Sequence, residues 1–113
     1  MVTLRKKGNI AILQPTGNII GTAVRDMRTV MTKQIDTANK PLILIDFQRV
    51  QKMDSGGLGT LMSAYKLARS KNGRIAIIHV GKNIKNLIVR SRLINMFEHF
   101  NTEAAAIYGL KRK

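Results

Sequence analysis

Two short apolar runs constrain the fold of this chain more than any other feature of its sequence. Residues 42–45 read Leu-Ile-Leu-Ile, and residues 75–78, within a strand expected over 74–80, read Ile-Ala-Ile-Ile. Each run has the length of a strand and is apolar at every position, which predicts a strand that is buried on both faces. Strands of this kind are typical of parallel sheets, so we expect an α/β domain.

Segments with a helical spacing of apolar residues alternate with these strands. The first is expected from Thr22, as N-cap, to about Ala38. A second follows residues 54–57 and ends near residues 71–73, where Asn-Gly supplies the stop. With the two apolar runs, this second helix forms a strand-helix-strand unit, for which a right-handed crossover is expected.

The remaining elements complete a small α/β domain. They are expected as strands over 2–6 and 9–14 joined around Gly8 as a hairpin, a helix opening at 81–83 and stopping near 91–92, a short edge strand over 97–100, and a last helix capped by Asn101 or Thr102. The predicted architecture is a mixed, mostly parallel central sheet of about four to five strands, packed with about four helices.

Chain length and composition limit the class of protein. The 113 residues suffice for one compact domain and are too few for two, so residues 1–113 are interpreted as a single domain with a basic C-terminal tail at 111–113. The absence of cysteine excludes disulfides and thiolate-held metal sites. No apolar signal segment is evident, and no apolar run approaches the roughly 20 residues that span a bilayer. We therefore expect a soluble cytoplasmic protein.

The sequence contains no recognisable catalytic, metal-binding or cofactor-binding motif. Neither His79 nor His99 has a carboxylate at ligand spacing, and His79, at the end of a buried strand, is interpreted as structural. Asp46 and Asp54 are interpreted as a strand-end residue and a helix-start residue rather than as a catalytic pair. The prediction is a protein that is not an enzyme and that binds no metal or cofactor.

A glycine-rich segment at residues 53–59 stands between the first buried strand and the second helix. Asp54 or Ser55 is a suitable N-cap for that helix. Capping does not explain three glycines within four residues, since each weakens a helix by about 1 kcal/mol relative to alanine. The glycines indicate a small surface that another backbone can approach closely.

Several segments together carry a pattern found in a known family. They stand at residues 42–47, 53–61, 65–68, 73–77, 85–88 and 91–97, and Asp54-Ser55-Gly56-Gly57-Leu58-Gly59 is the most specific part. In order and spacing they resemble the STAS family, and most of all its anti-sigma-factor antagonists. The N-terminal hairpin and residues 15–19 match more loosely and extend the resemblance to nearly the whole chain.

The resemblance implies a protein-binding switch in bacterial transcription regulation. Ser55 takes the place of the serine that a partner, both kinase and anti-sigma factor, phosphorylates in this family. The unphosphorylated antagonist binds the anti-sigma factor and frees the sigma factor, and a phosphatase resets the phosphorylated form. The residues expected to contact the partner are Asp54, Gly56, Gly57, Leu58 and Thr60.

The sequence departs from the family pattern at two positions. Gly56 stands where the family often has a second serine or threonine, so Ser55 is the one hydroxyl-bearing residue of this loop. Ile20 stands where an early Gly-x-Leu/Ile-Asp pattern has an acid that helps to bind the kinase, which suggests an altered choice of partner.

The net charge of +14 is unusual for such an antagonist. A field of this sign attracts acidic proteins, nucleic acid or anionic lipid. It points to an acidic partner surface, or to one of two alternatives: a STAS regulatory subunit of a transport or stress-signalling assembly, or a basic module that binds nucleic acid or a lipid surface. Nucleic acid is disfavoured because no helix-turn-helix, zinc finger or aromatic RNA-binding motif is present.

Overall fold

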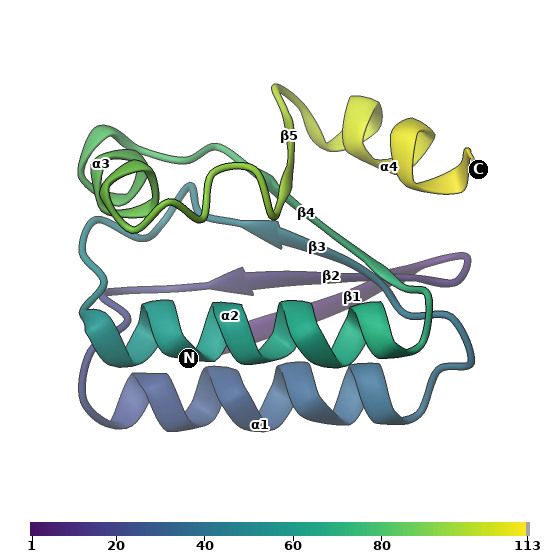
Figure 1. The fold of residues 1–113 in the computed structure, drawn as a ribbon, viewed down its shortest axis with the longest axis horizontal. Coiled ribbons are helices and arrows are strands. Elements are labelled where there is room, and N and C mark those ends of the chain that lie inside the picture. Colours follow the sequence, from purple (N-terminus) through teal and green to yellow (C-terminus); the bar gives the residue numbers. More distant parts are fainter. Residues whose placement is uncertain (113) are drawn as a thin grey trace.

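The two apolar runs lie side by side at the centre of a five-stranded sheet in the computed structural model, which describes residues 1–112 (Figure 1). The strand order is β1-β2-β3-β4-β5, with β1 antiparallel to β2 and the other pairs parallel. The strands are β1 (Val2–Lys7), β2 (Ile10–Pro15), β3 (Leu42–Asp46), β4 (Arg74–Ile78) and β5 (Glu98–Phe100). The helices are α1 (Thr22–Asp36), α2 (Ser55–Ser70), α3 (Lys82–Arg90) and α4 (Glu103–Lys111). The predicted mixed, mostly parallel sheet is confirmed.

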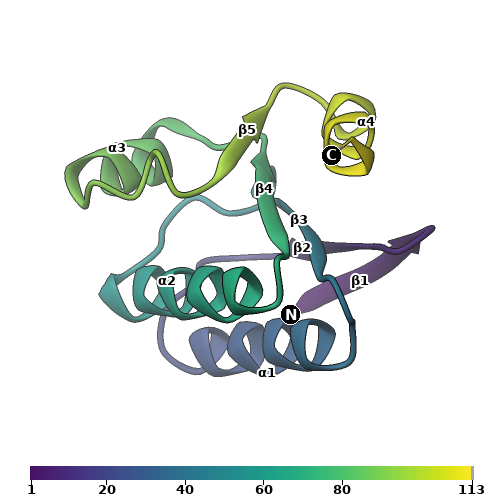
Figure 2. The same ribbon diagram turned by 45° about the vertical axis from the view of Figure 1, so that its right-hand side comes forward.

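Helices cover both faces of the sheet, because the apolar strands have side chains to bury on each face. On one face, α1, α2 and α3 bury the larger apolar cluster, into which Ile43 and Ile45 of β3 point. On the other face, Leu42 and Leu44 of the same strand pack in a smaller cluster with α4. Figure 2 shows α2 and α3 on one side of β4 and β5, and α4 on the other. The continuous apolar run of β3 therefore reflects burial from both sides.

The N-cap predicted for α1 is wrong by one residue. Thr22 is the first helical residue, and the N-cap is Gly21, whose φ is 58° and which makes no side-chain capping bond. The chain enters α1 through a left-handed backbone conformation, which glycine adopts without a steric penalty. For the last helix, Thr102 is the N-cap, and its hydroxyl accepts a hydrogen bond from Ala105 N at 3.0 Å.

The sequence predicted a basic tail from residue 111, but the ordered contacts of the C-terminal segment extend to Arg112. Lys111, predicted as part of a basic tail, is the last residue of α4. The carbonyl of the next residue, Arg112, accepts a hydrogen bond from the Arg74 guanidinium at 2.6 Å. Lys113, the remaining tail residue, lies outside the described residues.

Among the helices of residues 1–112, none combines the length and the apolar character needed to cross a membrane.

Candidate functional site

Ser55 is the first residue of α2 and is exposed to solvent. The residue before it, Asp54, is the N-cap, and its Oδ1 accepts a hydrogen bond from Gly57 N at 2.9 Å. Of the two caps that the sequence allowed, Asp54 is therefore the one used. Because Asp54 supplies this bond, the start of the helix does not depend on the Ser55 hydroxyl.

The loops that follow the carboxyl ends of β2 and β3 fix the position of this helix start. Ile19 N donates to Lys52 O at 2.9 Å, and Asp54 N donates in turn to Ile19 O at 3.3 Å. The Asn18 side chain accepts a hydrogen bond from Lys52 N at 3.1 Å. The segment that leads into α2 thus pairs with the loop after β2 in the manner of a short parallel bridge, Ile19 to Met53. Ser55 is presented from a hydrogen-bonded framework rather than from an unsupported loop.

The glycines of this segment have different surroundings. A Cβ on Gly57 would lie 2.5 Å from Met53 Cγ and 3.0 Å from Ile19 Cγ2, so no side chain fits there without a shift. On Gly59 a Cβ would meet nothing within 4 Å. Gly56 is exposed and lies beside Val24 of α1. The close approach that the sequence suggested exists at Gly57, and its partner is the domain's own interior.

The five residues expected to contact a partner are divided between the surface and the interior. Asp54 and Gly56 are exposed beside Ser55, and Leu58 is half-buried against the larger apolar cluster. Gly57 is buried, and Thr60 is 2% exposed with its hydroxyl donating to Gly56 O at 3.0 Å. The structure therefore assigns Gly57 and Thr60 to the packing of the helix start, where they lie out of direct reach of another protein.

Ile20, which stands where the family pattern has an acid, is 48% exposed in the loop between β2 and α1. Its carbonyl accepts a hydrogen bond from Ala23 N at 3.2 Å, in the first turn of α1. The side chain adds apolar area, and no charge, to the edge of the sheet that carries Ser55.

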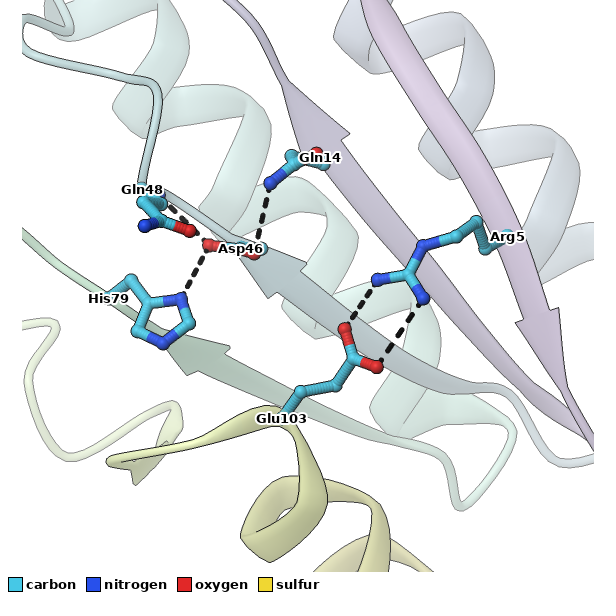
Figure 3. Close-up of polar contacts among 6 residues, drawn as sticks. All are labelled: Arg5, Gln14, Asp46, Gln48, His79 and Glu103. Carbon is cyan, nitrogen blue, oxygen red and sulfur yellow. Dashed lines mark hydrogen bonds and ion pairs between the residues drawn. The ribbon is translucent and has the colours of Figure 1, made fainter.

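A buried carboxylate ties together the ends of three strands near this edge (Figure 3). Asp46, at the end of β3, is 4% exposed, and its Oδ1 lies 2.9 Å from Nδ1 of His79, the residue after β4. The same Oδ1 accepts a hydrogen bond from Gln48 N at 2.9 Å, and Oδ2 accepts one from Gln14 Nε2 of β2 at 3.1 Å. His79 has a φ of 56°, in the left-handed region that few residues adopt.

Sequence reasoning missed the pairing of Asp46 with His79 because the residues are 33 positions apart. The available signal was topological, since the carboxyl ends of neighbouring parallel strands meet at one edge of the sheet. The interpretation of His79 as structural fits this network. Within residues 1–112, no group of three or more histidine, aspartate or glutamate side chains is arranged to hold a metal ion.

Comparison with known proteins places this geometry in a family. The sequence profile of the STAS domain matches residues 1–106. The anti-sigma F factor antagonist of Paenibacillus polymyxa is 28% identical over 85 residues, which make up 75% of this chain and 73% of that protein. The structure of the antagonist SpoIIAA in its unphosphorylated form has a TM-score of 0.87 at 20% identity, over 98% of this chain and 96% of that chain. The Bacillus cell fate determinant SpoIIAA in its phosphorylated form has a TM-score of 0.76 at 20% identity, over 96% of this chain and 98% of that chain.

The TM-scores show that this chain shares its overall fold with these solved structures. Because the profile spans nearly all of its length, the chain belongs to the STAS domain family. The family resemblance seen in the sequence segments is thereby confirmed.

Proposed function

We propose that this protein is an anti-sigma-factor antagonist whose binding to its partner is switched by phosphorylation of Ser55. The observation that carries the proposal is the position of Ser55, exposed at the first residue of α2 while Asp54 caps the helix. A kinase can reach the hydroxyl, and its modification breaks no bond on which the fold depends.

The relatives support this choice of function. The Paenibacillus polymyxa protein is named an anti-sigma F factor antagonist, and SpoIIAA has been solved in both phosphorylated and unphosphorylated forms. By analogy, the proposed partner is an anti-sigma factor that is also a serine kinase, and a phosphatase restores the unphosphorylated form. The protein itself then acts by binding, without catalysis of its own, in the cytoplasm.

The physical effect of the switch lies at the interface rather than in the fold. A phosphate adds roughly −1.5 to −2 charge and considerable bulk. The N-terminus of α2 tolerates an anion, because its backbone N–H groups and dipole favour negative charge. The modified helix start therefore stays folded, and what changes is the surface that a partner meets. Loss of binding follows from steric overlap or from repulsion of negative groups on the partner.

The site assignment can be tested by phosphorylation in a lysate of the source cells supplied with ATP. Mass spectrometry of the recovered protein is expected to find phosphate on Ser55, and to find none on the Ser55→Ala variant. Ser63 is an exposed serine further along α2, so Ser63→Ala is the matched control and is expected to be phosphorylated like the wild type. Phosphate on Ser55→Ala at the wild-type level would refute the assignment.

The switch is tested separately by affinity for the partner recovered in that lysate. Ser55→Ala is expected to bind as well as the unphosphorylated wild type, and Ser55→Asp to bind about tenfold more weakly. Ser55→Asn has the size of the aspartate without its charge, so it separates repulsion from steric overlap. Equal affinity for Ser55→Asp and Ser55→Ala would contradict the switch.

A further inference from the structure

Exposed lysines and arginines follow the carboxyl ends of β3 and β4, the end of the sheet at which Ser55 lies. Between residues 79 and 97 the sequence contains no acid, and α3 with the turn after it presents exposed lysines and arginines. The loop before α2 adds Arg49 and Lys52, both exposed. The members of this group on α3 and its following turn are Lys82, Lys85, Arg90 and Arg92.

Three of the six acids are held in ion pairs elsewhere, and Asp54, the exposed acid beside this group, uses its Oδ1 to cap α2. Glu98 and Glu103 form ion pairs with Arg74 and Arg5, and Asp46 is buried against His79. Within the part of the chain that the structure describes, these are the ion pairs formed by histidine, lysine or arginine side chains. The exposed cations of α3 and of the loop before α2 are therefore available for a negatively charged partner.

A shallow groove runs between that loop and one stripe of α3. It has a volume of about 310 Å³ and is lined by Lys52, Met53, Asn83, Asn86, Leu87 and Arg90. The four α3 residues stand at positions i, i+3, i+4 and i+7, so they share one face of the helix. The groove thus combines an apolar floor of methionine and leucine, two amide side chains and a cation from each wall.

We infer that this groove binds an acidic segment of the partner protein; the inference rests on the proposed function and specifies the chemistry of that partner. Carboxylates would pair with Lys52 and Arg90, the amides of Asn83 and Asn86 would bond to the segment's backbone, and an apolar side chain would cover Leu87. The exposed Ile20 and Val89, each 48% exposed, add apolar area near the same end of the molecule.

The lining of the groove favours a peptide over nucleic acid. Single-stranded nucleic acid binds where cations are combined with aromatic side chains on which bases stack. The groove has no aromatic residue, and its floor is formed by Met53 and Leu87. Such a floor suits the aliphatic side chains of a protein segment.

The groove also links partner binding to the proposed switch. Met53 lines the groove and stands two residues before Ser55 in the chain. A phosphate on Ser55 would place a dianion beside the groove, where it competes with the partner's carboxylates for the cations and repels them. Release of an acidic partner then follows without a change of fold.

The test uses the whole protein and a short fluorescent peptide that is rich in glutamate and contains leucine, with binding followed by fluorescence anisotropy. The double variant Lys52→Glu/Arg90→Glu is expected to lose about tenfold in affinity. Its control, Lys6→Glu/Lys7→Glu, makes the same change in net charge on the β1–β2 hairpin and is expected to lose less than about twofold. A matched peptide with glutamine in place of glutamate is expected to bind the wild type about tenfold more weakly.

Three outcomes would overturn the inference. Equal weakening in both double variants would mean that the net charge, and not the groove, attracts the peptide. Groove-dependent binding of duplex DNA or of phosphatidylserine vesicles that exceeds peptide binding would assign the surface to a different partner. Failure of the neutral double variant Lys52→Gln/Arg90→Gln to weaken peptide binding, with its far-ultraviolet circular dichroism unchanged, would exclude a role for these cations. These experiments leave Ser55 unchanged. Failure of the groove inference can therefore be distinguished from failure of the proposed function, which the Ser55 variants test.

Discussion

The two ends of α2 use glycine and positive charge in different ways. At the C-terminal end, a Cβ on Gly73 would lie 2.4 Å from the backbone oxygen of Pro41. Beside it, the Lys71 ammonium group donates hydrogen bonds to three carbonyl oxygens at the end of α1, each at 2.9 Å, from Ile35, Asp36 and Ala38. This lysine donates to carbonyl oxygens at and just beyond the C-terminus of α1, where the helical hydrogen-bond ladder ends. Here a cation stabilises the fold.

At the N-terminal end, by contrast, side chains and not backbone surround the glycines. Gly57 meets the side chains of Met53 and Ile19, while Gly59 is open to solvent. Lys52 and Arg90 line a surface groove instead of binding carbonyls within the fold. Cations of this basic protein thus stabilise the fold at one end of α2 and line an open surface groove at the other end.

The largest effect is expected for Gly73→Ala, at the C-terminal end. The new Cβ would collide with the Pro41 backbone, which cannot move without disturbing the start of β3. We expect a loss of about 3 kcal/mol in the free energy of unfolding, measured by urea denaturation. Gly59→Ala is the control in open space within α2, and it is expected to stabilise the protein by about 0.5–1 kcal/mol. Similar results for the two variants would contradict the described packing.

Lys71→Met is expected to cost about 2 kcal/mol in the same measurement, since it removes the charged donor from three carbonyls of the α1 end. The methionine keeps most of the aliphatic stem. Lys66, exposed on α2, provides the control, and Lys66→Met is expected to stay within about 0.5 kcal/mol of the wild type. If both variants are equally stable, Lys71 does not hold the two helix ends together.

Gly57→Ala, at the N-terminal end, is expected to cost about 1.5 kcal/mol, which is less than Gly73→Ala. Its Cβ would meet the flexible side chain of Met53, which can adjust its conformation. A loss as large as that of Gly73→Ala would show that the surroundings of Gly57 are as rigid as those of Gly73.

The smallest of these effects is expected for Asp54→Ala, about 1 kcal/mol, because one capping hydrogen bond to Gly57 N is lost. Asp54→Asn retains an acceptor and is expected to recover most of this stability. Thermal unfolding of the three proteins in parallel measures the difference. Full stability of Asp54→Ala would mean that another group caps α2.

Local patterns in the sequence predicted most of the fold. The apolar runs at 42–45 and 75–78 identified the neighbouring interior strands β3 and β4, because burial on both faces favours apolar residues along a strand. The helical spacing of apolar residues located α1 and α2 to within a few residues. The cap of α1 was misassigned because a left-handed φ at Gly21 is set by the path of the preceding loop, which the pattern does not record.

The candidate site was predicted less completely, because its geometry depends on residues far apart in the chain. The position of Ser55 at a helix start followed from the local motif, and its exposure agrees with it. The packing of Gly57 against Ile19 and the pairing of Asp46 with His79 depend on strand order, and no local pattern reveals them. The groove beside α3 likewise exists only once residues 52–53 lie next to that helix.

The proposed function requires that the surface around Ser55 bind a partner that phosphate releases. The most direct measurement compares the Kd of the purified partner for the unphosphorylated protein and for the protein phosphorylated at Ser55, at the same salt concentration. We predict that phosphate raises the Kd at least about tenfold while the circular dichroism spectrum is unchanged. An identical Kd for the two forms would show that phosphate on Ser55 does not control partner binding.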